Sequence, residues 1–277
     1  MGVCRQVGYQ GEPGAYSEMA TDALEPEAES VPCRTLTDVF TRVESDDIDA
    51  GVVPVENSLA GSIGETYDLL LNFDLTITGE LILPVDHCLL AAPGTSLDAV
   101  REVMSHPQAL AQCQVYLSSL PAEQVPYYDT AGAARTISRS EAAGTAAVAS
   151  SRAAEIYGLT VLAAGIQSMK ENFTRFYRIE RDPRPRGERN KTVIALTLPH
   201  QPGSLFMALS SFSCRSLNLT RIESRPVGRN PWEYIFYLEF EGHMQDWQVQ
   251  SALEELDGKT GMLRVLGSFQ SNGRCAP

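Results

Sequence analysis

The sequence has few of the residues that build metal sites and disulfide frameworks. Its 277 residues include six cysteines and four histidines, and the cysteines are scattered with no C-x-x-C spacing. Zinc sites and redox motifs need such spacing, so we expect no metal site, no disulfide framework and no cofactor. A reducing compartment, the cytoplasm, is the corresponding expectation for the protein's location.

Long apolar runs and a surplus of basic residues are also missing. No apolar stretch reaches the ~18 residues that a membrane span needs, and the N-terminus lacks the pattern of a signal peptide. Lys and Arg total 22 against 35 Asp and Glu, which gives a net charge of -13. This balance argues against a nucleic-acid partner. An anionic small molecule would need local positive potential, which helix N-termini and a few arginines can supply.

The residues that are present predict an α/β protein. Short strand-like runs alternate with helical spacing up to residue 181, and polar clusters follow the strand ends. This pattern indicates two α/β lobes around a cleft, as in periplasmic binding proteins. We place one lobe at about 1–80 plus 165–181 and the other at 81–164. The charged, proline-rich stretch 182–190 predicts a domain boundary.

The C-terminal part has a different order of elements. Between residues 191 and 270 the pattern predicts strand, helix, two strands, helix and strand. This βαββαβ order is that of the ferredoxin-like sandwich. Gly228–Pro231 is expected to join the two central strands, and Pro202–Leu205 to open the first helix, where backbone N–H groups can bind a carboxylate.

Glycines also open the first helix of the chain. Gly11, Pro13 and Gly14 separate the first strand from a helix over Ala15–Leu24, with Ser17 in its first turn. Glycines at such a turn let a ligand approach the backbone, and the free N–H groups attract anions. The spacing is not G-x-G-x-x-G, so a dinucleotide is poorly supported. A purely structural turn is the alternative.

A polar cluster ends the third strand. A helix predicted over Thr37–Ser45, with Thr37 as its cap, leads into an apolar strand that stops at Glu56, Asn57 and Ser58. Ligands of open α/β sheets bind beyond the carboxyl ends of strands. The alternative is that Glu56 and Asn57 only cap the next helix.

Three helices of the second lobe are predicted to begin at small or polar residues. They begin near His106–Gln108, Asp129–Ala131 and Ala149–Ser151. Helix starts offer backbone N–H donors, so three in one lobe suggest a ring of donors for an anion. A single histidine at a helix start is more often a cap than a catalyst.

The segment Asn172–Phe176 brings together a hydroxyl, a cation and aromatic rings. On an extended backbone, Thr174 and Phe176 share one face, while Phe173 and Arg175 share the other. Taken alone, the segment is more typical of an edge strand whose polar side chains face water, and only the other segments of the chain favour a binding site.

Together these segments resemble the prephenate dehydratase family in its form with a C-terminal ACT regulatory domain. The resemblance covers nearly the whole chain, with motifs in the family's order: Gly11–Ser17, Pro54–Gly61, His106–Leu110, Asp129–Ala134, Asn172–Phe176, Gly203–Leu205 and Glu223–Pro226. It implies a catalytic domain at 1–181, an ACT domain at 191–270, and a homodimer or homotetramer. The implied reaction is loss of water and carbon dioxide from prephenate, giving phenylpyruvate in phenylalanine biosynthesis. No chorismate mutase segment precedes the first strand, so we expect a single-function enzyme.

The family's motifs imply roles for residues of this chain. Thr174 maps onto the threonine that assists departure of the ring hydroxyl, and Glu56 is the candidate proton source or hydroxyl orienter. Arg175 would pair with a substrate carboxylate, and Phe176 would exclude water. The other implied substrate-binding residues are Ser17, Asn57, Ser58, Gly61, Gln108, Thr130 and Ala131.

The ACT resemblance implies phenylalanine as a feedback ligand at a dimer interface. The contacts it implies, shared between one subunit and its partner, are Gly203, Ser204, Leu205, Asn218, Leu219, Glu223, Ser224 and Arg225. The sequence does not set the sign of this regulation.

Two other functions fit the same sequence. Arogenate dehydratase performs the same elimination on an amino acid instead of a keto acid, and no residue here separates the two substrates. A non-catalytic two-lobed amino-acid sensor is the alternative of another class. Thr174 beside Arg175 favours an enzyme, because a sensor has no need of that pair.

Overall fold

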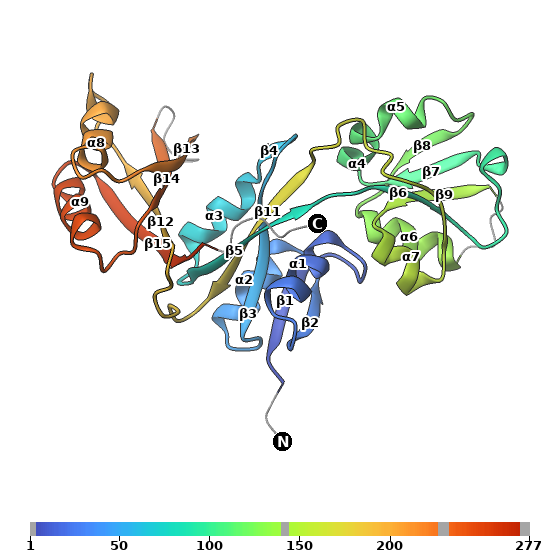
Figure 1. The fold of residues 1–277 in the computed structure, drawn as a ribbon, viewed down its shortest axis with the longest axis horizontal. Helices are drawn as coiled ribbons and strands as arrows, with labels where there is room; N and C mark the ends of the chain where they lie inside the picture. The colour runs from blue at the N-terminus through green and yellow to red at the C-terminus, as the bar shows by residue number, and fades with distance from the viewer. Residues whose placement is uncertain (1–3, 140–143, 227–232, 272–277) are drawn as a thin grey trace. The chain divides into compact units, whose positions relative to one another are not determined.

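The computed structural model describes residues 4–139, 144–226 and 233–271, and the chain forms two compact units (Figure 1). The first lies within Met1–Ile63 and Leu81–Phe176, and the second within Gly64–Glu80 and Tyr177–Gly273. Helices and strands alternate through most of the chain, which confirms the predicted α/β class. The predicted loop Gly228–Pro231 lies outside the described residues.

The first lobe of the first unit is built on a parallel sheet. Its elements are β1 (Gln6–Gln10), α1 (Tyr16–Leu24), β2 (Glu29–Cys33), α2 (Leu36–Glu44), β3 (Ala50–Asn57) and β4 (Gly61–Ser62). β1 pairs in parallel with β2 and with β3, so the carboxyl ends of these strands lie at one edge of the sheet. Leu81 and Leu83 of β5 (Thr76–Pro84) and Phe176 of β11 (Phe173–Glu180) complete its core.

The second lobe has its own five-stranded sheet, in the order β10-β6-β9-β7-β8. Its elements are β6 (Cys88–Ala91), η1 (Leu97–Ala99), β7 (Glu102–Ser105), α4 (Pro107–Gln112), α5 (Gln114–Leu117), β8 (Glu123–Pro126), α6 (Thr130–Arg139), β9 (Thr145–Ala149), α7 (Ser151–Tyr157) and β10 (Thr160–Ala164). Buried alanines of α6, α7 and β9 pack together, because small side chains let helices approach a sheet closely.

The second unit contains the predicted βαββαβ order. Its elements are β12 (Asn190–Thr197), α8 (Ser204–Ser213), β13 (Leu219–Pro226), β14 (Tyr234–Glu241), α9 (Trp247–Asp257) and β15 (Met262–Gln270). The strands lie in the order β13-β14-β12-β15, and neighbours are antiparallel. Helices α8 and α9 cover one face, where Phe212 and Val249 pack against Leu238 of β14.

Helix α3 (Gly64–Asn72) covers the other face of this sheet (Figure 1). Tyr67 of α3 packs on Tyr237 of β14, with ring centroids 4.8 Å apart. Tyr237 lies next to Leu238 along the strand, so the two side chains point to opposite faces. The predicted boundaries at 181 and 191 place residues 64–80 in the catalytic domain, whereas the compact units group them with the C-terminal part.

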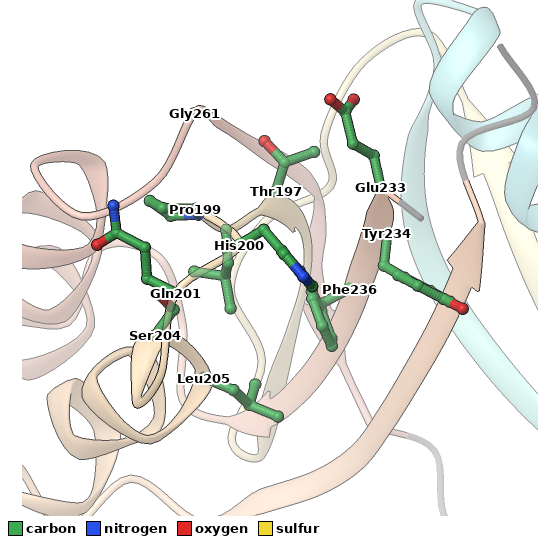
Figure 2. Close-up of a pocket in the computed structure, with 11 residues that line it drawn as sticks. Thr197, Pro199, His200, Gln201, Ser204, Leu205, Glu233, Tyr234, Phe236 and Gly261 are labelled. Atoms are coloured by element: carbon green, nitrogen blue, oxygen red, sulfur yellow. The ribbon is translucent and has the colours of Figure 1, made fainter. Parts of the chain in front are cut away.

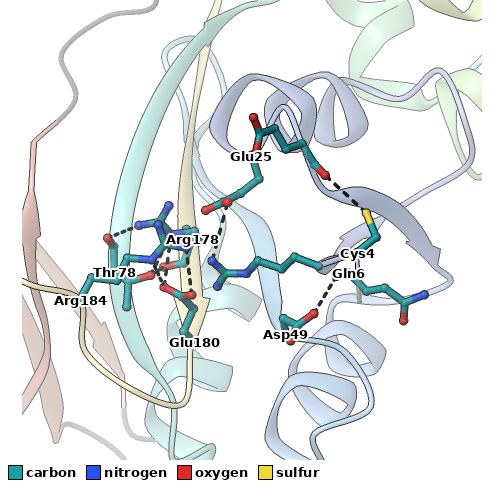
Figure 3. Close-up of polar contacts among 10 residues, drawn as sticks. Cys4, Gln6, Glu25, Asp49, Thr78, Arg178, Glu180 and Arg184 are labelled. Atoms are coloured by element: carbon teal, nitrogen blue, oxygen red, sulfur yellow. Dashed lines mark hydrogen bonds and ion pairs between the residues drawn. The ribbon is translucent and has the colours of Figure 1, made fainter. Parts of the chain in front are cut away.

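Buried Arg178 joins β5 and β11 in the second unit (Figure 3). Its Nε donates to Thr78 Oγ1 at 3.0 Å, and its Nη2 donates to the Thr78 carbonyl at 2.7 Å. Glu180 Oε2 lies 3.4 Å from Arg178 Nε and accepts from Arg184 Nε at 2.9 Å. A buried charge is tolerated when it is paired and hydrogen-bonded, as this one is.

Helix α2 begins earlier than predicted, and its cap is Thr35. Thr35 Oγ1 accepts from Asp38 N at 3.0 Å, and Asp38 Oδ2 accepts from Thr35 N at 3.1 Å. The prediction of Thr37 as the cap was wrong, because only Thr35 has an acidic residue three positions later to complete a capping box.

We expect Thr35→Ala to lower the free energy of unfolding by about 1 kcal/mol, because the first turn of α2 loses its cap. Thr37→Ala is the matched control, since Thr37 lies inside the helix and does not cap it. Urea denaturation of both variants measures the difference. Equal stability of the two variants would contradict the capping assignment.

Candidate active site

The polar residues after β3 meet the start of β11. Ser58 N donates to the Phe173 carbonyl at 2.8 Å, and Phe173 N donates to Ser58 Oγ at 3.0 Å. Strand β4 folds back on β3, pairing Asn57 with Gly61, whose φ of 83° is readily adopted only by glycine. Two segments that the sequence predicted to share a site, 54–61 and 172–176, are therefore adjacent.

The side-chain amide of Asn57 lies at the centre of this junction and is buried. Its Oδ1 accepts from the N–H groups of Leu59 and Ala60 at 3.1 and 3.0 Å. These backbone donors fix which end of the amide is oxygen. The Nδ2 group therefore points the other way, to Asn172 Oδ1 at 2.7 Å and Thr174 Oγ1 at 3.1 Å.

The orientation of Asn57 determines the role of the Thr174 hydroxyl. Because Thr174 Oγ1 accepts a hydrogen bond from Asn57, its own proton is directed away from Asn57. A hydroxyl held in this way is available as a hydrogen-bond donor to a bound molecule. Thr174 is half-buried, so solvent or a ligand can reach it.

Gln112, at the end of α4, connects this amide cluster to the second lobe. Gln112 Nε2 donates to Asn57 Oδ1 at 3.3 Å, and Gln112 Oε1 accepts from Asn172 Nδ2 at 3.0 Å. His87 Nε2 lies 2.9 Å from the same Gln112 oxygen, so the ring donates through Nε2. Tyr16 Oη lies 3.0 Å from His87 Nδ1.

Four residues of this cluster were not predicted to belong to the site: Tyr16, His87, Gln112 and Asn172. Asn172 was the easiest of them to predict from the sequence, because it is the first residue of the motif that contains Thr174. His87 belongs to no motif and reaches the cluster only through the fold. Its pKa is lowered, mainly because burial disfavours the charged ring, while the hydrogen bond to Gln112 and the charge of Asp86 oppose this in part.

Arg175 points to the other face of β11, as alternation predicts. Its Nε lies 4.0 Å from Glu56 Oε2. Both residues line a cavity of about 210 Å³ together with Ser58, Ile82 and Phe173. The structure therefore pairs Glu56 with Arg175, and Asn57 with Thr174, on opposite faces of the two strands.

Two predicted site residues have their side chains in hydrophobic cores. Phe176 is 1% exposed and packs in the core of the first lobe, so its ring supports the sheet beneath Thr174. Ala131 is fully buried in the alanine-rich core of the second lobe. Only the backbone of Ala131, at the start of α6 beside Thr130, can meet a ligand.

The three helix starts of the second lobe already use part of their donor capacity. His106 Nδ1 accepts from Gln108 N at 3.2 Å at the start of α4. Asp129 Oδ1 accepts from Gly132 N at 2.6 Å in α6, and Ser150 Oγ accepts from Ala153 N at 3.0 Å in α7. His106 therefore caps α4, which is the more common role of a single histidine at a helix start. Gln108 is exposed.

The first glycine turn is bound to the second lobe. Ser150 Oγ donates to the Gly14 carbonyl at 2.6 Å, and Tyr157 Oη donates to the Pro13 carbonyl at 2.8 Å. Glu12 Oε2 lies 2.6 Å from Arg135 Nη1. These contacts fix the turn that leads to half-buried Ser17 in α1.

A cavity of about 730 Å³ lies beside this turn. Its lining includes the oppositely charged side chains Glu12, Arg34, Asp129 and Arg135. Burial raises the pKa of Asp129, and the N–H of Gly132 opposes this in part.

A separate pocket of about 450 Å³ lies in the second unit (Figure 2). Ser204 and Leu205 line it, as do Tyr234 and Phe236 of β14 and Glu233, the residue just before that strand. Gly203, with φ of 85°, opens α8 beside it. A helix start, a carboxylate and apolar walls complement the carboxylate, amine and side chain of an apolar amino acid.

The remaining predicted effector residues belong to β13 and its start, and they do not line this pocket. They are Asn218, Leu219, Glu223, Ser224 and Arg225. The Arg225 guanidinium binds Asp68 of α3, with Nη2 2.8 Å from Oδ2.

Within the described ranges, no cluster of His, Cys, Asp and Glu side chains is arranged to hold a metal ion. The five cysteines in the same ranges are free thiols. None of the helices described there combines the length and apolarity needed to cross a membrane.

Comparison with known proteins gives consistent matches over almost the whole chain. A model of the prephenate dehydratase family matches residues 7–184. Arogenate dehydratase/prephenate dehydratase 2 of Arabidopsis thaliana, a chloroplastic protein, is 45% identical over 95% of this chain and 72% of its own length.

Solved structures agree with this match. A prephenate dehydratase from Arthrobacter aurescens in complex with L-Phe has a TM-score of 0.88 and 31% identity, covering 96% of this chain and 90% of its own. GqqA, described as a novel type of quorum-quenching acylase, has a TM-score of 0.89 and 33% identity, covering 97% of this chain and 99% of its own.

We expect the stability of the protein to fall at mildly acidic pH, in part through His87. Since burial lowers its folded pKa, the unfolded chain binds more protons near its own pKa of about 6.5, and stability is lost as the pH falls through that value. The free energy of unfolding should therefore fall less in His87→Gln than in the unchanged protein between about pH 7.5 and about pH 5.5. Urea titrations at both pH values measure this, and an equal fall in both proteins would contradict it.

Proposed function

The chain belongs to the prephenate dehydratase family, and from this premise we propose that it converts prephenate to phenylpyruvate with loss of water and carbon dioxide. It is a lyase of phenylalanine biosynthesis. The observation that best supports the proposed mechanism is the hydrogen bond from Asn57 Nδ2 to Thr174 Oγ1. It leaves the threonine proton available to the departing oxygen of a substrate.

The reaction needs little covalent chemistry from the protein. The bond between the ring and its carboxylate breaks, and its electron pair moves into the ring as carbon dioxide leaves. The bond from the opposite ring carbon to its hydroxyl then breaks with its electron pair, and the oxygen takes up a proton to leave as water. Aromatisation drives these steps, so the protein positions the dianion and assists proton delivery.

Thr174 is the residue that we assign to the departing hydroxyl. A threonine hydroxyl is a very weak acid, so it acts by donating a hydrogen bond to the leaving oxygen and passing on a proton that solvent replaces. Asn57 keeps the hydroxyl in this orientation, since its amide is itself fixed by two backbone N–H groups.

Positive potential for the substrate carboxylates comes from Arg175 and from helix starts. Glu56 Oε2 lies 4.0 Å from Arg175 Nε, so we propose that Glu56 orients the guanidinium. Glu56 and Arg175 lie on the face of their strands opposite to Thr174, so we assign both of them to a substrate carboxylate and neither to the departing hydroxyl. Ser17, Ser58, Gly61, Gln108 and Thr130 remain candidates for binding the substrate.

Prephenate and arogenate remain the two candidate substrates. The Arabidopsis relative is named for both activities. Cytoplasmic location stays a prediction, since that plant relative is chloroplastic.

We further propose phenylalanine as the effector of an ACT domain at 191–270. The pocket beside Ser204 and Leu205 supports this, as does the L-Phe complex of the Arthrobacter enzyme. The β13 residues Glu223 to Arg225 do not line that pocket, which favours a homodimer or larger homo-oligomer in which a partner supplies them.

Incubation with prephenate and, separately, with arogenate tests the proposed function. We expect phenylpyruvate absorbance to appear with prephenate, and Thr174→Ala to lower kcat by ~10²–10⁴-fold, because the leaving oxygen loses its donor. Thr174→Ser is the matched control, since it keeps the hydroxyl. Turnover of arogenate alone would make arogenate the substrate in place of prephenate. Turnover of neither substrate would refute the proposed function.

We expect Glu56→Gln to raise KM more than it lowers kcat, because the uncharged amide orients Arg175 less firmly while Thr174 is untouched. Steady-state kinetics with the preferred substrate separate the two effects. A loss of kcat as large as that of Thr174→Ala would instead make Glu56 the proton source.

A further inference from the structure

Helix α3 continues directly from the hairpin that carries the candidate catalytic amide. Strand β4 pairs with Glu56 and Asn57 of β3 and ends at Ser62. Ile63 N donates to the Val55 carbonyl at 2.9 Å, and α3 begins at the next residue, Gly64. A single residue of covalent chain therefore separates the hairpin from the start of α3.

The same helix is bound to β13, the strand that carries the predicted effector residues. Arg225 Nε donates to Asp68 Oδ1 at 3.1 Å, and Arg225 Nη2 donates to Asp68 Oδ2 at 2.8 Å, a bidentate pair. The pair raises the pKa of Arg225. A Cβ built on Gly64 would overlap the Arg225 guanidinium, so the guanidinium packs on the backbone at the helix start.

Further contacts hold the middle and the end of α3 against the sheet. The Arg221 guanidinium lies 5.1 Å from the centre of the Tyr67 ring, within the range of a cation–π contact. Tyr237 Oη donates to the Tyr67 carbonyl at 3.1 Å. Arg264 of β15 donates to the carbonyls of Leu71 and Phe73 at 2.6 and 2.7 Å, which satisfies the C-terminal end of the helix.

We propose that α3 transmits regulation from β13 to the active-site hairpin, with the Asp68–Arg225 pair as the contact that phenylalanine changes. This inference rests on the proposed function and names the element through which its regulation acts. A ligand that binds beside Glu223 and Arg225 alters the position of the guanidinium. Movement of the guanidinium displaces Asp68 and with it the start of α3. Movement of the helix start in turn displaces the hairpin that contains Asn57.

The exposure of the pair suits this role. The Arg225 and Asp68 side chains are 28% and 56% exposed, so the pair can break and re-form in contact with water. Tyr67, by contrast, is 1% exposed and holds α3 on the sheet whether or not the pair is formed. Coupling between effector binding and catalysis requires two arrangements to which the ligand binds with different affinity. The formed and the broken Asp68–Arg225 pair are two such arrangements, and the packed core is the same in both.

The experiment uses the full chain with phenylalanine as the probe. Asp68→Asn removes the charge at nearly constant size, and Asp68→Glu retains it. Asp74→Asn is the matched control, because it removes an equal charge from a fully exposed carboxylate just beyond α3. For each protein, kcat/KM is measured with and without saturating phenylalanine, and the Kd of phenylalanine is measured by calorimetry.

We expect all three variants to turn over substrate within about twofold of the unchanged protein when phenylalanine is absent. In Asp68→Asn, phenylalanine should still bind, but its effect on kcat/KM should shrink by about fivefold or more. Asp68→Glu and Asp74→Asn should keep the full effect. An unchanged effect in Asp68→Asn, with or without a loss of stability, would overturn the proposal.

Hydrogen exchange separates this inference from the enzymatic proposal, because it requires no turnover. Phenylalanine should change the exchange of residues 57–72 in the unchanged protein and not in Asp68→Asn. Lack of turnover with either substrate refutes the proposed function alone. Failure of phenylalanine to bind, or binding that leaves residues 57–72 unchanged, overturns the inference whether or not the enzyme is active.

Discussion

The hydrogen bonds of one buried amide, that of Asn57, set the geometry on which the rest of the site depends. Two backbone N–H groups of the β3–β4 turn fix its oxygen, and this leaves its nitrogen facing Thr174 and Asn172. Reversing the amide would place a donor against donors, which is costly in a buried cluster. The direction of the threonine proton thus follows from the backbone of a tight hairpin.

The same amide cluster links the two lobes of the first unit. Gln112 comes from the second lobe, yet it shares hydrogen bonds with both Asn57 and Asn172. His87 Nε2 donates a second hydrogen bond to the Gln112 side-chain oxygen, and burial favours the neutral ring that donates through Nε2 alone. A strongly acidic protein therefore builds this junction from neutral amides and imidazole, and keeps its cation, Arg175, on the opposite face of the strand.

Local patterns predicted the parts of the fold that depend on neighbouring residues. Alternation along β11 separated Thr174 from Arg175 correctly, and the order of apolar runs gave the βαββαβ unit. The cap of α2 was also readable, since Asp38 follows Thr35 by three positions. His87 and Gln112 could not be found in this way, because only the tertiary fold brings them to Asn57. The grouping of α3 with the C-terminal sheet likewise depends on the distant contact between Tyr67 and Tyr237.

The polar contacts that we propose for catalysis and for regulation differ in kind. The amides around Thr174 are buried, so a broken hydrogen bond there leaves a polar group without water, and the arrangement stays rigid. The Asp68–Arg225 pair is partly exposed, and water compensates each partner when the pair separates. A rigid cluster keeps the orientation of the Thr174 hydroxyl fixed, whereas a weak ion pair can open or close when a ligand binds. Helix α3 joins the two because it leaves the rigid hairpin at Gly64 and meets the weak pair within its first turns.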